Sequence, residues 1–134
     1  MKNNHNAWFA IAKDDVSAAK VLLTSEHFSL ATYYCQQATE KALKGYLVFK
    51  KQEILATHDL TKLVRLCIEF DRNFEEFIGA ADYINPFATE CGYPVEFDIV
   101  ERDTAEQAVK HAQKILAFVL KKVSAPDTGQ EKLF

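Results

Sequence analysis

The fold prediction starts from the stretch YYCQQATEKALKGYL, residues 33–47. Its apolar residues recur every three to four positions, as on one side of an α-helix, and several are small enough for a neighbouring helix to pack closely. Its polar residues follow the same repeat at spacings of one, three and four and therefore share one face. These polar residues are Gln36, Gln37, Glu40, Lys41 and Lys44.

Two interpretations of this polar face stay open. Glu40 and Lys44 have the spacing of an i,i+4 ion pair, and a mostly solvated surface is the first interpretation. Tyr33 and Leu47 lie among the charges, however, and a purely solvated face rarely contains such side chains. The second interpretation is a face that binds a ligand or a second subunit.

The rest of the chain extends the helical pattern, because only four glycines and three prolines interrupt 134 residues. We expect an all-α fold, a single-domain up-and-down bundle of four to five helices. The expected helices cover residues 7–24, 29–51, 59–70, 73–85 and 104–123. In domain terms we expect an N-terminal tail over residues 1–6, a helical domain over 7–123 and a flexible C-terminal tail over 124–134.

Local chemistry marks several helix starts. The candidate N-caps are Ser29 for the second helix, Thr57 or Asp59 for the third, and Asp103 with Glu106 in a capping box for the fifth. Before the fifth helix, residues 86–102 form a connection of a length that is often functional.

Composition excludes several classes of protein. A net charge of -3 and a pI near 5.8 give no general attraction to nucleic acid, so polyanion binding would need a local basic patch. The chain has no apolar run of membrane-spanning length and no signal peptide, and we expect a cytoplasmic protein. The three cysteines and four histidines have no metal-ligand spacing, so we expect reduced cysteines, no metal site and no cofactor.

Asp15 falls near the middle of the apolar arc of the first helix, with Ile11 one turn before it. A buried, unpaired carboxylate costs several kcal/mol and must find a donor. Lys41 and Lys44 are the nearest candidates if the first two helices form an antiparallel hairpin. The alternative is that Asp15 lies at the end of the bundle and stays hydrated.

His58 and Asp59 stand immediately before the third helix. An imidazole at a helix N-terminus can contribute to phosphate binding together with the backbone N–H groups. Capping alone is the first interpretation, with Asp59 accepting the backbone donors and His58 turned to solvent.

Together these residues resemble the HEPN domain, the higher-eukaryote and prokaryote nucleotide-binding domain. The resemblance covers about residues 7–123 and rests mainly on QQATEKALKGYL, residues 36–47, followed by HDL, residues 58–60. It implies a compact helical bundle that forms homodimers, often beside a small partner nucleotidyltransferase in toxin-antitoxin or stress systems. It also implies nucleotide or RNA binding.

Some HEPN proteins are ribonucleases that use an Arg followed four to six residues later by a His. None of Arg65, Arg72 and Arg102 has a His in that window, and Gly92 stands near the Tyr-Pro loop, where related chains commonly carry an Arg. We therefore expect no catalytic residues and no enzyme activity.

Three hypotheses follow. The first is a non-catalytic homodimer that binds a nucleotide, a partner nucleotidyltransferase or both through Gln37, Lys41, Lys44 and His58, with Asp15, Glu40 and Asp59 as structural or charge partners. The second is a pure interaction module whose dimer face explains Tyr33 and Leu47. The third is a divergent ribonuclease built from His58, Asp59 and Lys41.

Overall fold

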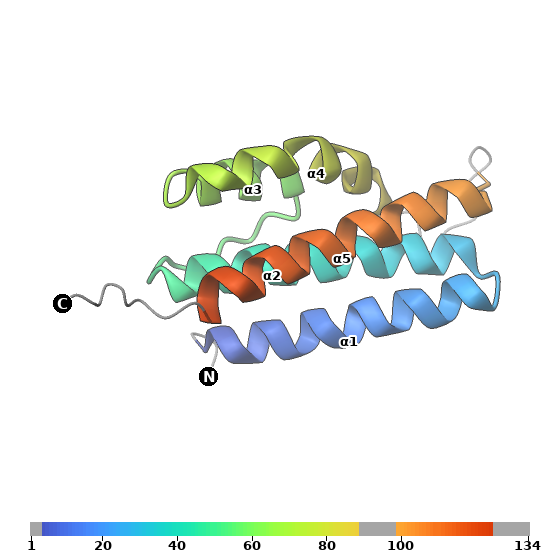
Figure 1. Ribbon diagram of the computed structural model, residues 1–134, viewed down its shortest axis with the longest axis horizontal. Helices are drawn as coiled ribbons and strands as arrows, with labels where there is room; N and C mark the ends of the chain where they lie inside the picture. The colour runs from blue at the N-terminus through green and yellow to red at the C-terminus, as the bar shows by residue number, and fades with distance from the viewer. Residues whose placement is uncertain (1–3, 89–98, 125–134) are drawn as a thin grey trace.

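The computed structural model describes residues 4–88 and 99–124, and within these ranges it is an all-α bundle with no strand (Figure 1). The chain thus forms the single helical domain that its sequence predicts. Within the described residues, the five α-helices and two 3₁₀ helices are α1 (His5–Thr24), α2 (Phe28–Phe49), α3 (Leu60–Ile68), η1 (Arg72–Phe77), α4 (Ile78–Ile84), η2 (Asn85–Ala88) and α5 (Arg102–Ser124).

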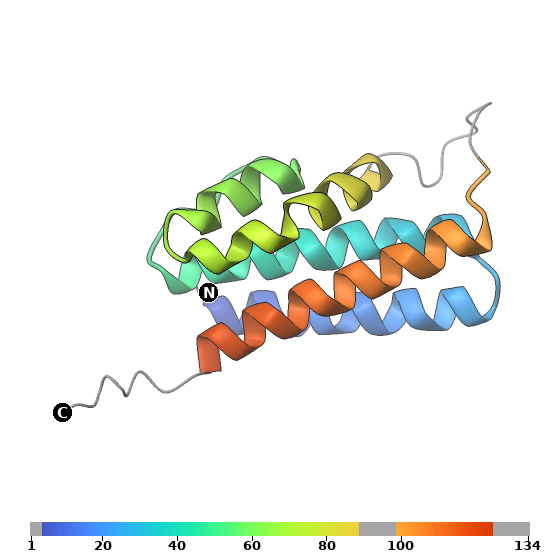
Figure 2. The ribbon, with the colours of Figure 1, turned by 45° about the horizontal axis from the view of Figure 1, so that its top comes forward.

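The second helix, α2, is the centre of the bundle. In Figures 1 and 2 it runs beside α1 and behind α5, while α3 and α4 cover it from above. Because other helices surround it, it is buried around most of its circumference, including the polar positions Gln36, Glu40 and Lys44. A mostly solvated polar face is therefore wrong for these three residues.

Close packing between α1 and α2 depends on Gly45. A methyl group at this position would lie 2.5 Å from the ring of Phe9, which is only 3% exposed. The apolar arc predicted for α1 is largely correct, with Phe9, Ala12 and Val16 in the core. Ile11 departs from that prediction, because its side chain is 47% exposed.

The predicted fourth helix is divided into η1 and α4. Phe74 and Phe77 both reach the core at a spacing of three, which matches the three residues per turn of a 3₁₀ helix. Asp71 starts this segment by accepting a hydrogen bond from the backbone N–H of Asn73 at 3.0 Å. The single helix expected over residues 73–85 is therefore wrong in its first half.

The helix boundaries differ by a few residues from those expected. Of the predicted N-caps, Asp59 is confirmed, whereas Ser29 and Asp103 are wrong. Asp59 caps α3 as predicted, accepting a hydrogen bond from the Lys62 N–H at 3.2 Å. Ser29 does not cap α2, which starts one residue earlier and has no side-chain cap. Asp103 lies inside the first turn of α5 instead of capping it, because that helix begins at Arg102.

Cys35 and Cys67 are free thiols in the core, as predicted. Burial raises the pKa of Cys35 to about 12 and that of Cys67 still further. Cys91, Gly92 and most of the long connection lie outside the described residues, as does the C-terminal tail from residue 125. Across the described residues, no helix is both long enough and apolar enough to cross a bilayer.

Candidate functional site

A continuous chain of polar side chains runs along α2. Lys44 Nζ donates to Glu40 Oε2 at 2.8 Å, which confirms the i,i+4 pair. Gln36 Nε2 donates to Glu40 Oε1 at 3.2 Å. Gln37 Nε2 donates to Gln36 Oε1 at 2.8 Å, and Lys41 Nζ donates to Gln37 Oε1 at 2.9 Å. We call these five residues, together with His58, the polar network.

Glu40 is the centre of the polar network. Its side chain is only 5% exposed, and burial by itself would raise its pKa. The hydrogen bonds and charge of Lys44, together with hydrogen bonds from His58 and Gln36, outweigh burial and lower the pKa below its ordinary value. Glu40 is therefore a carboxylate at neutral pH, stabilised by three donors.

The linker over residues 50–59 returns along α2 and brings His58 to this carboxylate. Gln36 Nε2 fixes the linker backbone by donating to the carbonyl oxygen of His58 at 3.2 Å. The His58 ring places Nδ1 at 3.0 Å from both oxygens of Glu40. Because the carboxylate can only accept, Nδ1 carries the proton, and Nε2 is left for other partners on a side chain that is 69% exposed.

The outer end of the polar network lies toward α1. Gln37 and Lys41 are half-buried, so both are accessible in part. Asp15 on α1 is also half-buried, and burial raises the pKa of its carboxyl group. The positive charge of Lys41 acts in the opposite direction, and Asp14 adds to the increase. Asp15 is thus neither deeply buried nor fully hydrated, and it interacts electrostatically with Lys41, one of the two predicted donors.

Asp59 is next to His58 in sequence but serves a different purpose. Its Oδ1 accepts hydrogen bonds from the Lys62 N–H and from Asn85 Nδ2 at 3.0 Å. Asn85 in turn accepts a hydrogen bond from the Leu60 N–H at 2.8 Å. Hydrogen bonds, that from Asn85 foremost, lower the pKa of Asp59. The carboxylate therefore fixes the start of α3, and nothing in the sequence marks Asn85 as its partner.

The structure thus brings most of the predicted site residues together. Gln37, Lys41, Glu40 and His58 belong to one hydrogen-bonded network, and Asp15 faces its outer end. Lys44 belongs to it as well, but its side chain is 8% exposed and its amine is held by Glu40. Gln36, which is fully buried and joins the two halves, was not among the predicted site residues.

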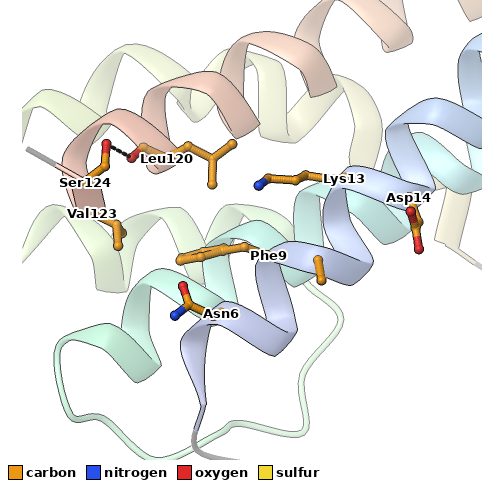
Figure 3. A pocket seen from close by; sticks show the side chains of 8 residues that line it. Asn6, Phe9, Lys13, Asp14, Leu120, Val123 and Ser124 are labelled. Carbon is orange, nitrogen blue, oxygen red and sulfur yellow. Dashed lines mark hydrogen bonds between the residues drawn. The ribbon is translucent and has the colours of Figure 1, made fainter.

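Cavities lie elsewhere on the molecule. The cavity in Figure 3 has a volume of about 700 Å³ and lies between the first half of α1 and the end of α5, where Phe9 and Leu120 border it. Two further cavities, of about 590 and 350 Å³, adjoin the end of α2. None of the three is lined by a predicted site residue, so the polar network does not form the wall of any of these cavities. Over residues 4–88 and 99–124, no group of three His, Cys, Asp or Glu side chains could hold a metal ion.

Comparison with known proteins identifies relatives of the same fold. The HEPN domain family matches this chain over residues 5–123. The crystal structure of TT1696 from Thermus thermophilus is similar with 26% identity and a TM-score of 0.77, covering 90% of this chain and 98% of that one. The crystal structure of ST0689, described as an archaeal HEPN homologue, has 22% identity and a TM-score of 0.74 with the same coverage. Among curated proteins, none matches the chain.

Proposed function

From the premise that the chain belongs to the HEPN domain family, we propose that it is a cytoplasmic, homodimeric and non-catalytic binding module. Its ligand is a nucleotide, a partner nucleotidyltransferase or both, in a toxin-antitoxin or stress-related system. The contact surface is the exposed edge of the polar network, formed by Gln37, Lys41 and His58.

One observation carries this proposal: a buried carboxylate holds an exposed imidazole in a fixed orientation. Glu40 accepts the Nδ1 proton of His58 at 3.0 Å while the rest of the ring faces outward. When the ring carries a second proton, on Nε2, that N–H can donate to a phosphate oxygen without first losing rotational freedom. Lys41 supplies a second positive group on the same network, and cationic donors form the strong, charge-assisted hydrogen bonds that phosphates accept.

Lys44 has a different role in this proposal from the one its sequence position predicts. Its amine neutralises Glu40 inside the bundle and so keeps the carboxylate buried and ionised. A buried charge without a partner is strongly destabilising, whereas a paired one is tolerated. Lys44 therefore acts on the ligand through Glu40 and His58 and does not contact phosphate itself.

Isothermal titration calorimetry with ATP, GTP and their monophosphates at millimolar concentration tests the proposal. We expect binding that weakens about tenfold or more in Lys41→Ala and in His58→Ala, since each change removes one charge-assisted hydrogen bond. Lys20→Ala is the matched control, because Lys20 is exposed on α1 and is not part of the polar network. No heat with any nucleotide, or equal binding by all four proteins, would exclude this surface as a nucleotide site.

A pure interaction module is the second candidate, and two exposed side chains favour it. Ile11 on α1 is 47% exposed and Leu30 on α2 is 39% exposed, and Tyr33 is half-buried one turn before Gln37. These side chains mark a contact between chains only if they form one contiguous patch, because apolar residues that are exposed singly are normal on a protein surface. Leu47 does not contribute to such a face, because it is 4% exposed and belongs to the core.

Sedimentation analysis separates the two candidates. The interaction module would be favoured if Ile11→Asp dissociates the dimer and if nucleotides do not change the dissociation constant of the dimer. A dimer that nucleotides stabilise would favour the leading proposal, because a ligand that binds one state preferentially shifts the equilibrium toward it.

The third hypothesis, a ribonuclease that uses His58, Asp59 and Lys41, is not supported by the geometry of Asp59. The Asp59 carboxylate is directed to the Lys62 N–H and to Asn85 at the start of α3. It therefore has no hydrogen bond to His58 with which it could orient the imidazole. The proposal accordingly keeps the module non-catalytic, and incubation of the purified protein with mixed RNA checks this point.

A further inference from the structure

The helices α2 and α3 both end at the same end of the bundle (Figures 1 and 2). A groove lies there, beside Leu47 at the end of α2 and Phe70 just after α3. Its volume is about 350 Å³, enough for one or two large side chains. Four apolar and three polar residues line it, namely Leu47, Leu55, Leu66, Phe70, Gln52, Glu53 and Glu69.

Two of the apolar residues that line the groove are exposed to solvent. Leu55 in the linker is 36% exposed, and Phe70, just after α3, is 41% exposed. The described residues include seven exposed large apolar side chains. Of these seven, only Leu55 and Phe70 line any of the three cavities described above, and both line this groove. Apolar side chains that are exposed singly need no explanation, but two that line the same groove indicate a contact surface.

The rim of the groove is negative. Glu53 and Glu69 are both exposed, and the lining contains no lysine, arginine or histidine. Neither carboxylate takes part in an ion pair within residues 4–88 and 99–124, whereas Glu26 and Asp71 are paired with Arg102 and Lys122. A groove lined by apolar side chains and by two carboxylates without an ion pair among the described residues is complementary to an apolar side chain flanked by cations.

We propose that this groove binds a segment of another protein that carries an apolar anchor between lysine or arginine residues. The anchor covers Leu55, Leu66 and Phe70, while the cations meet Glu53 and Glu69. This surface is separate from Gln37, Lys41 and His58, none of which lines the groove. The inference is therefore independent of nucleotide binding.

Two-dimensional ¹H–¹⁵N NMR titration tests the groove with three blocked hexapeptides. The first carries two leucines between two lysines, the second replaces the lysines with glutamates, and the third replaces the leucines with serines. We expect the first peptide to shift the amide signals of Leu55, Leu66 and Phe70 and to bind at least fivefold more tightly than the other two.

A charge-reversed variant makes the test specific. In Glu53→Lys combined with Glu69→Lys, both at exposed positions, we expect the preference to change from the lysine peptide to the glutamate peptide. Phe70→Ser should abolish binding, whereas Val21→Ser, at a 67% exposed position of α1, should not change it.

Several results would overturn the inference. No shift with any peptide at millimolar concentration would show that the groove does not bind such segments. Equal binding of the lysine and glutamate peptides would show that the carboxylates do not select the partner. If no peptide binds, but the protein self-associates and Phe70→Ser abolishes this self-association, the groove binds a second copy of this chain instead.

Discussion

Glu40 illustrates how one residue links stability to function. Its carboxylate is nearly inaccessible to water, yet it accepts hydrogen bonds from Lys44, Gln36 and His58. Removing water from a carboxylate is costly, and a domain of this size has only a few kcal/mol of net stability in reserve. Buried ion pairs often stabilise a core no better than apolar residues of similar size. The evident effect of the arrangement is to fix the imidazole of His58 at the surface.

At this scale we expect a specific pH dependence of stability. The folded pKa of Glu40 is below its ordinary value of 4.5, so its stabilising contribution is complete above that pH and is lost as the pH falls through the folded pKa. The variant Glu40→Gln should be less stable than the native protein by about 2 kcal/mol near pH 6, because Lys44 loses its charged partner. That difference should shrink as the pH falls below 4.5 toward about pH 3, because the unfolded state then takes up a proton on Glu40 more readily than the folded state does.

Urea unfolding at the two pH values measures this difference. Asp59 and Asp71 also have lowered pKa values, but they are present in both proteins and cancel in the comparison. A difference in the free energy of unfolding that stays constant from pH 6 to pH 3 would contradict the assignment of Glu40 as the buried, stabilised carboxylate.

Among the elements, the contact between α1 and α2 depends on how closely the two helices approach. Gly45 lies in the interior of α2, where glycine is a poor helix former. It is required because the ring of Phe9 occupies the place of a side chain. Gly79 in α4 is exposed, and a methyl group placed on it would have no neighbouring atom within 4 Å. Both residues are therefore helical glycines, but a side chain at Gly45 would clash and a side chain at Gly79 would not.

We expect opposite effects when each glycine is replaced by alanine. Gly45→Ala should destabilise the protein by about 1–3 kcal/mol, since the overpacking against Phe9 exceeds the gain in helix propensity. Gly79→Ala should stabilise it by about 0.5 kcal/mol, because only the propensity and the unfolded-state entropy change. Chemical denaturation of both variants checks the pair, and a stabilising Gly45→Ala would show that the helices do not approach this closely.

For the helices, the sequence predicts where they form better than it predicts which of their residues are buried. The i,i+4 spacing of Glu40 and Lys44 was sufficient to predict their pairing, because it depends only on local helical geometry. Their burial was not predictable from that spacing, because it depends on α1, α3 and α5 packing around α2. The contact of His58 with Glu40 depends on the path of the linker along α2, to which no local pattern points.

Across the whole molecule, the polar network and the acidic groove occupy different surfaces. The polar network spans the middle of α2 and faces α1 and the linker, while the groove lies where α2 and α3 end. In our two proposals, the first surface binds phosphate through positive groups and the second binds cationic side chains through carboxylates. A small domain with these two surfaces could hold a nucleotide and a protein segment at the same time, and binding of one should leave the affinity for the other unchanged.

Long-range ¹H–¹⁵N NMR of the histidine side chains tests the central claim most directly. We expect neutral His58 to carry its proton on Nδ1, to lose this preference in Glu40→Leu combined with Lys44→Leu, which removes the acceptor without leaving a buried unpaired charge, and to carry a proton on Nε2 as well when ATP is bound. His58 with its proton on Nε2, or a ring whose signals ignore both the double substitution and saturating nucleotide, would contradict the account.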